Sequence, residues 1–151
     1  MLDPTDTRLI HLLQRQGDAT AAQLGEVLNL STSQAARRRS RLEEAGIITG
    51  YSVRLNPQSL GLTVQAFLQV TLRGGDPLAR AAFLDLTSDL AAVTGCWALA
   101  GEAHYLLRVW CADLKALDQL IHQTILPHPS VAAASAQVVT DEIKRDTGLP
   151  V

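Results

Sequence analysis

The chain has 151 residues, of which 47% are hydrophobic and 19% charged, and its formal net charge at pH 7 is −2. This composition is typical of a globular protein with one ordinary domain or two small ones, and it excludes an intrinsically disordered chain. No apolar run approaches the ~20 residues that a membrane-spanning helix needs, so we expect no membrane partner.

Charge is distributed unevenly along the chain. Residues 1–56 carry seven arginines against six acidic residues, whereas residues 57–151 carry six basic residues against nine acidic ones. A polyanionic partner is therefore expected to meet the first part of the chain. Because the first residues lack the basic region and apolar stretch of a secretory signal, we expect a cytoplasmic protein.

Three helices and a β element are predicted in the first part. Apolar residues recur at helical spacing in residues 5–16, 20–29 and 31–45, and an Asp, Thr or Ser stands at the start of each segment as a potential N-cap. Residues 47–55 alternate between apolar and polar positions, which is typical of a strand or hairpin. Two helices joined by a short turn and followed by a β element predict a winged helix–turn–helix.

Arginine is concentrated on the third predicted helix. At 100° per residue, Ser33, Gln34, Arg37 and Arg41 fall on one side of this helix. Guanidinium groups suit phosphates and guanine edges, and a glutamine amide suits adenine. The candidate DNA-contacting residues are Ser31, Thr32, Ser33, Gln34, Arg37, Arg38 and Arg41.

A solvated helix whose arginines pair with Glu43 and Glu44 is the alternative interpretation. Arg39 falls near the packing side of the helix, where it must extend outward or pair with an acid. Arg38 lies at the edge of the exposed side, so a structural role is open for it as well. The position of the arginines on the second helix of a helix–turn–helix favours DNA binding.

The second part of the chain predicts alternating strands and helices. Strands are expected at residues 63–72, 93–100, 104–111 and 131–143, and helices are expected after Pro77 and Asp113. Leu78, Ala82, Leu86 and Leu90 are expected to form the packing face of the first of these helices. The order βαββαβ is that of the ferredoxin-like arrangement, so the fold class is α+β.

Aromatic residues are spread over the predicted strands. Phe67, Trp97 and Trp110 place apolar surface on a sheet whose helices cover one face only. We therefore expect a second subunit to cover the other face.

No catalytic or metal-binding motif is present in the sequence. Cys96 and Cys111 are not spaced as metal ligands, and we expect two buried thiols rather than a disulfide or a zinc site. The histidines show no ligand spacing, and the glycine motifs of nucleotide-binding loops are absent. We expect no cofactor, no metal ion and no enzymatic activity.

Several sequence motifs occur together and point to one protein family. They are Leu-Asp-x-x-Asp from Leu2, Leu-Ser-x-Ser from Leu30, Leu-Glu-x-x-Gly-Ile from Leu42, Gly-Tyr at Gly50, and the segments 101–121 and 138–151. With these motifs, nearly the whole chain resembles the Lrp/AsnC family of bacterial and archaeal transcription regulators. The C-terminal tail is most similar to the leucine-responsive branch.

The resemblance implies a specific domain organisation and set of partners. It implies a winged helix–turn–helix at residues 1–50, a linker strand at 51–61, and a βαββαβ effector and oligomerisation domain at 62–151. It further implies a nucleoid-associated homodimer, assembling into tetramers or octamers, that binds pseudo-palindromic operators of genes for amino-acid metabolism or transport. An amino acid such as leucine or methionine would bind between dimers.

The implied effector site departs from the family pattern. The family motif Gly-x-x-Asp-Tyr appears here as residues 101–105, with His104 in the place of the aspartate. A carboxylate can hold an ammonium group, whereas a neutral histidine could accept one ordinary hydrogen bond from it and a protonated histidine would repel it. The candidate effector-binding residues are Gly101, Glu102, His104, Tyr105, Ala134 and Ala136, the two alanines standing where Ser or Thr is frequent.

Two other functions are compatible with the same residues. One is a DNA-organising protein that responds to no effector. The other is an enzyme resembling the siroheme decarboxylases, in which His104 would act on a tetrapyrrole.

Overall fold

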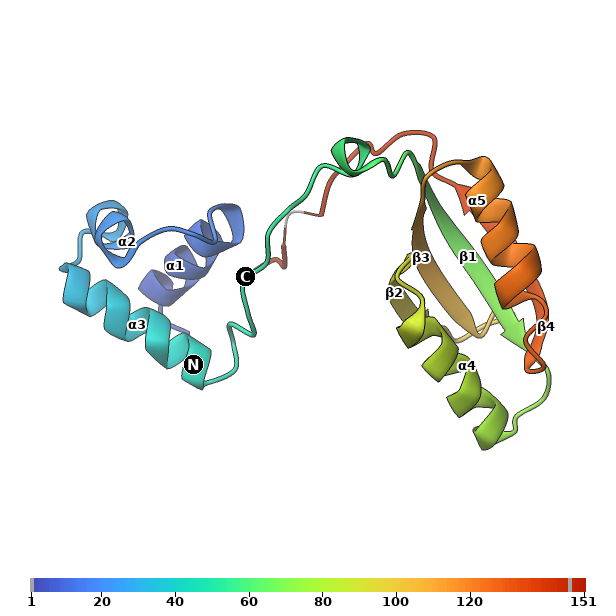
Figure 1. Ribbon diagram of the computed structural model, residues 1–151. Coiled ribbons are helices and arrows are strands. Elements are labelled where there is room, and N and C mark those ends of the chain that lie inside the picture. Colours follow the sequence, from blue (N-terminus) through green and yellow to red (C-terminus); the bar gives the residue numbers. More distant parts are fainter. Residues whose placement is uncertain (1, 147) are drawn as a thin grey trace. The chain divides into compact units, whose positions relative to one another are not determined.

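The computed structural model describes residues 2–146 and 148–151, and the chain divides into two compact units (Figure 1). The first unit comprises Met1–Arg54 together with Lys144–Val151, and the second comprises Leu55–Ile143. The end of the chain thus joins the helices of the first unit, where the Nε2 atom of His11 lies 3.0 Å from the carbonyl oxygen of Val151.

The first unit contains the three predicted helices. They are α1 (Pro4–Arg15), α2 (Ala21–Leu28) and α3 (Thr32–Glu44). Each helix begins at a reciprocal capping box, in which two side chains three positions apart each accept the backbone N–H of the other residue; the pairs are Asp3–Asp6, Thr20–Gln23 and Ser31–Gln34. These caps satisfy backbone donors that a helix start leaves unpaired, which is why each helix begins where it does.

The turn between α2 and α3 is tight. Asn29 adopts the left-handed conformation (φ 55°) at the end of α2. A Cβ atom on Gly25 would lie 2.7 Å from the carbonyl oxygen of Leu30, so only glycine allows this close approach. The buried residues Leu9, Leu24 and Leu42 then hold the three helices around one small core.

The expected β wing and linker strand are not formed. The structure assigns no strand to any described residue between α3 and Val64, where the only regular element is the short 3-10 helix η1 (Gln58–Leu60). Residues 51–56 are exposed, and no neighbouring strand accepts their backbone hydrogen bonds. An alternating sequence is therefore not sufficient for a strand in a single chain, because a strand needs a paired neighbour.

The second unit has the predicted βαββαβ order. Its elements are β1 (Val64–Leu72), α4 (Pro77–Asp89), β2 (Val93–Ala98), β3 (Tyr105–Cys111), α5 (Leu114–Gln119), which continues into the π-helical turn η2 (Leu120–Ile125), and β4 (Val131–Val138). The strands form an antiparallel sheet in the order β2-β3-β1-β4 (Figure 1). The α+β fold class is confirmed.

The two faces of this sheet differ in their environment. Alternate residues of β1 and β3, such as Leu68 and Leu107, pack with Phe83 of α4 and Ile125 of η2 in one core. Phe67, Trp97 and Trp110 lie on the opposite face according to the strand register. The aromatic residues named in the sequence analysis thus lie on the face without helices, where Trp97 is 45% exposed.

The packing face of α4 differs from the sequence-based expectation. Phe83 and Thr87 are the buried residues of this helix, whereas Leu78 is 79% exposed and Ala82 is also exposed. The Thr87 hydroxyl can be buried because it donates to the carbonyl oxygen of Leu84. Phe83 therefore sets the face that meets the sheet; of the expected residues, Leu90 packs against this core and Leu86 is half-buried.

The two cysteines also differ from each other. Cys111 is buried, as expected, and burial raises the pKa of its thiol. Cys96 is exposed because it lies on the edge strand β2, so the expectation of two buried thiols is wrong for this residue. Within residues 2–146 and 148–151, no helix is long and apolar enough to cross a bilayer, and no cluster of three or more His, Cys, Asp or Glu side chains could hold a metal ion.

Replacing Phe83 by alanine should lower the free energy of unfolding by about 3–5 kcal/mol, because it leaves a cavity against β1 and β3. Leu78→Ala on the same helix is the matched control and should change it by less than about 0.5 kcal/mol. Denaturant unfolding, monitored by tryptophan fluorescence, measures the free energy of unfolding of both variants. Equal effects of the two substitutions would contradict the observed packing face.

Candidate functional site

The candidate DNA-contacting residues lie along α3, from its N-cap Ser31 to Arg41 in its last turn. Ser31, Thr32, Ser33, Gln34, Arg37 and Arg41 are exposed, and Arg38 is half-buried. The structure therefore brings all seven onto one helix, as the sequence predicts. Some of their side chains, however, already form hydrogen bonds or ion pairs with other residues of the chain. These contacts decide which donors, acceptors and charges each side chain still has available for a ligand.

Ser31 and Gln34 are engaged with each other. The backbone N–H of Ser31 donates to Oε1 of Gln34 at 3.0 Å, and the backbone N–H of Gln34 donates to the Ser31 hydroxyl at 3.2 Å. Bidentate pairing with adenine requires the amide oxygen as well as the amide nitrogen. While this capping box is closed, Gln34 can offer only its side-chain N–H groups.

Arg38 and Arg41 form ion pairs with the start of α1. Nη1 of Arg38 lies 2.6 Å from Oδ2 of Asp3 and 2.7 Å from Oδ1 of Asp6, and Nη2 of Arg41 lies 2.6 Å from Oδ2 of Asp6. The Asp6 side chain is only 3% exposed. The hydrogen bond from Arg38 holds the pKa of Asp3 below its usual value, and the same bond raises the pKa of Arg38. These contacts hold α3 against α1.

Arg39 has a structural role at the other side of α3. Its Nε atom lies 3.2 Å from Oε1 of Glu43, and its guanidinium group lies 5.5 Å from the centre of the Tyr51 ring. The Tyr51 hydroxyl donates to the same glutamate oxygen at 2.7 Å, and burial together with this bond raises the pKa of Tyr51. Pairing of arginine with Glu43, the alternative interpretation of the helix, thus holds for Arg39.

Arg37 is the arginine of α3 that no acidic group neutralises. It is exposed and makes no hydrogen bond or ion pair with any residue that the structure describes. It lines a small hollow of about 160 Å³ together with Arg38 and Arg41. The side chain of Arg41 is 58% exposed despite its ion pair, so Arg37 and Arg41 together form a positive surface on α3.

A second candidate site lies at the end of the sheet in the second unit. A pocket of about 540 Å³ is lined by His104 and Tyr105. Its other lining residues are Leu72, Gly74, Gly75, Asp76, Arg80, Ala98 and Leu99. Sequence reasoning missed these because Gly74–Pro77 has the pattern of a turn and helix start, with no sign that it faces the turn between β2 and β3.

The other candidate effector residues do not line this pocket. Gly101 and Glu102 are exposed in the turn before β3. Ala134 and Ala136 are on β4, which pairs with β1 on the side opposite to β3. Two strand spacings, about 10 Å, therefore separate β4 from β3.

The hydrogen bonds of His104 make its ring a donor, whereas we expected an acceptor. Its backbone N–H donates to the carbonyl oxygen of Val70 at 3.0 Å, and its Nδ1 atom accepts the backbone N–H of Leu72 at 3.0 Å. Because Nδ1 is an acceptor, the ring proton is on Nε2. His104 therefore offers a donor to the pocket and not the acceptor that we expected.

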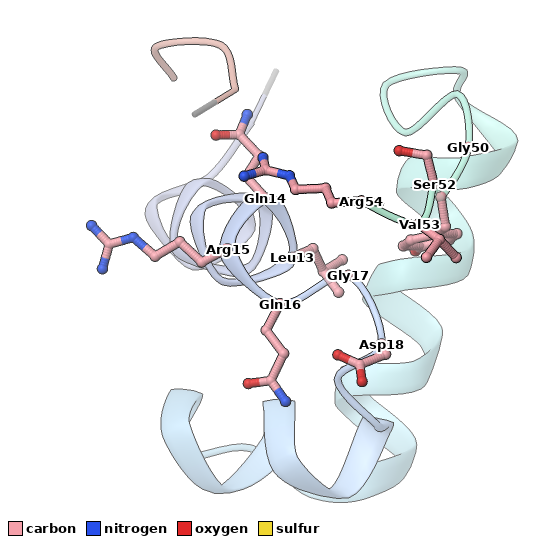
Figure 2. Close-up of a pocket in the computed structure, with 11 residues that line it drawn as sticks. Leu13, Gln14, Arg15, Gln16, Gly17, Asp18, Gly50, Ser52, Val53 and Arg54 are labelled. Atoms are coloured by element: carbon pink, nitrogen blue, oxygen red, sulfur yellow. The ribbon is translucent and has the colours of Figure 1, made fainter. Parts of the chain in front are cut away.

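A further hollow lies in the first unit and contains none of the predicted site residues. It has a volume of about 620 Å³ and is lined by residues 13–18 at the end of α1 and by residues 50–54 (Figure 2). Val53 is 84% exposed, so the segment after α3 leaves apolar surface uncovered in the single chain.

Family models match most of the chain. The model of the AsnC-type helix-turn-helix domain matches residues 2–43, and the model of the Lrp/AsnC ligand binding domain matches residues 65–149. The first match covers the three helices, and the second covers the sheet unit and continues into the segment from Lys144 that belongs to the first unit.

Individual relatives align over at least 92% of their length. The DNA-binding transcriptional activator DecR of Escherichia coli K12 is 31% identical over 151 residues, which cover 100% of this chain and 99% of DecR. The leucine-responsive regulatory protein of the same organism is 30% identical over 150 residues, which cover 99% of this chain and 92% of that protein. A transcriptional regulator of Neisseria meningitidis, whose crystal structure is a complex with L-Met, is 37% identical in sequence. Its structure matches with a TM-score of 0.95, and the match covers 99% of this chain and 97% of that chain.

Asp6→Asn should lower the free energy of unfolding by about 2 kcal/mol, because it removes the charge that both Arg38 and Arg41 face. Asp18→Asn, in the exposed turn after α1, is the control and should have little effect. Amide hydrogen exchange of α1 and α3 provides the measurement. Unchanged protection in Asp6→Asn would show that these ion pairs do not hold α3.

Proposed function

The chain belongs to the Lrp/AsnC family of transcription regulators, and we propose that it binds pseudo-palindromic operators as a homodimer and responds to an amino-acid effector. It is a DNA-binding transcription regulator with a ligand-binding domain, and not an enzyme. The observation that carries the proposal is Arg37, an uncompensated arginine on the exposed side of the second helix of a helix–turn–helix.

The residues of α3 take different parts in the proposed DNA contact. Arg37 contacts a base edge or phosphate, and Ser33 and the N–H groups of Gln34 contact the operator from the first turn. Arg41 adds a second positive contact. Arg38 positions the helix through its ion pairs with α1 instead of reading DNA.

Arg37→Ala should weaken operator binding and reduce the slope of log Kobs against log[salt] by about one unit per subunit. The probe is a duplex selected from random sequence by the wild-type protein, and binding is measured by fluorescence anisotropy at several salt concentrations. Arg15→Ala, an exposed arginine in the last turn of α1, is the control. Wild-type affinity and slope in Arg37→Ala would contradict this recognition surface.

We further propose that the uncovered sheet face forms the dimer. Phe67, Trp97 and Trp110 supply its apolar surface, and the exposed segment 51–61 gains a strand partner from the second subunit. Two-fold symmetry then places the two half-sites about 10 base pairs apart or a multiple of that spacing. Dimers assemble further into tetramers or octamers.

Trp110→Glu should shift the protein towards the monomer, because a charge in an apolar interface must lose its hydration. Sedimentation velocity measures the shift. Leu114→Glu, at a residue that is 62% exposed on α5, is the matched control and should leave the assembly unchanged. A wild-type sedimentation profile for Trp110→Glu would exclude this face as the dimer interface.

The proposed effector is an amino acid such as leucine or methionine, bound in the pocket beside His104 where a second dimer closes the opening. The Neisseria meningitidis relative in complex with L-Met supports this class of ligand. The identities to DecR and to the leucine-responsive protein, 31% and 30%, do not separate one branch from the other. We propose genes of amino-acid metabolism or transport as targets, and the cytoplasmic nucleoid as the site of action.

A protein that organises DNA without an effector is the second candidate. The observation that favours it is His104, which puts a donor where the family motif has a carboxylate. It predicts DNA binding that no amino acid alters.

A further inference from the structure

The pocket beside His104 is lined by two opposite charges that do not pair with each other. Asp76 is the N-cap of α4 and Arg80 follows four residues later, with its backbone N–H donating to the carbonyl oxygen of Asp76 at 3.0 Å. Side chains four residues apart on a helix are neighbours and readily form ion pairs. Among the described residues, however, neither side chain takes part in an ion pair.

We propose that this pocket binds the zwitterionic end of an apolar α-amino acid, with its carboxylate held by Arg80 and His104 and its ammonium group held by Asp76. The inference rests on the proposed effector function and assigns the charges within it. An α-amino acid carries its two charges on one carbon atom, so it can bridge two opposite side chains that stand close together.

The donor side of the pocket is preorganised. The Nδ1 atom of His104 is occupied by the N–H of Leu72, which leaves Nε2–H as the donor that this ring can offer. The guanidinium group of Arg80 lies 6.0 Å from the centre of the Tyr105 ring, so it is held against the wall of the pocket by a cation–π contact. A guanidinium and an N–H donor are suited to a carboxylate.

The acceptor side is supplied by the start of α4. Oδ1 of Asp76 accepts the backbone N–H of Leu78 at 3.0 Å, and the other carboxylate oxygen has no partner among the described residues. Asp76 can therefore hold an ammonium group, which the Nε2–H donor of His104 cannot do.

The remaining walls indicate the side chain of the ligand. Leu72, Ala98 and Leu99 line the pocket with apolar surface. We therefore assign the ligand class to apolar amino acids.

The test measures the affinities of L-methionine and L-leucine, and of the corresponding 2-oxo acids, by isothermal titration calorimetry. The wild-type protein should bind at least one of the amino acids, and should bind it about tenfold or more tightly than the oxo acid that lacks the ammonium group. Asp76→Asn keeps a good N-cap residue but removes the charge, and should bring the ratio of the two affinities close to one. Arg80→Gln should weaken both ligands, and Asp89→Asn at the end of α4 is the matched control.

The possible outcomes separate this inference from the proposed function. Equal wild-type affinities for amino acid and oxo acid, or a preference that Asp76→Asn leaves intact, would overturn the assignment of Asp76 while the effector pocket stands. No binding of either ligand would overturn both the inference and the effector role. Operator binding by the wild-type protein, measured in parallel, tests the DNA-binding part independently.

Discussion

The orientation of α3 depends on one buried carboxylate at the start of another helix. Asp6 accepts from Arg38 and Arg41, which lie on successive turns of α3, and it also belongs to the capping box of α1. The Asp6 side chain thus caps the start of α1 and also forms the ion pairs that fix α3. A recognition helix must present its side chains in a fixed geometry, and a charged anchor of this kind is directional where apolar packing is not.

This arrangement gives a physical meaning to the Leu-Asp-x-x-Asp motif. Its two aspartates, Asp3 and Asp6, are spaced to form the capping box and at the same time to face the arginines of α3. The arginines of α3 therefore differ in whether an aspartate of α1 pairs with them. Arg38 is paired with α1, and Arg37 remains exposed.

The elements were predictable from the sequence, whereas most long-range contacts were not. Caps, apolar periodicity and glycine positions gave three helices and the βαββαβ order, because these signals are local. The pairing of Arg38 with Asp3 joins residues 35 positions apart, and nothing in either segment specifies it. The expected strand at residues 47–55 needed a partner that a single chain does not provide. Likewise, Asp76 and Arg80 enter the pocket only because the sheet brings the end of β1 beside the turn between β2 and β3.

The end of the chain gives the two units an uncommon connectivity. Because Lys144–Val151 belongs to the first unit, the sheet unit is in effect an insertion in the helical unit, with a chain crossing at each of its two ends. A truncation before Lys144 would therefore leave the sheet unit whole but remove part of the helical unit, including the carbonyl group that lies beside His11 of α1.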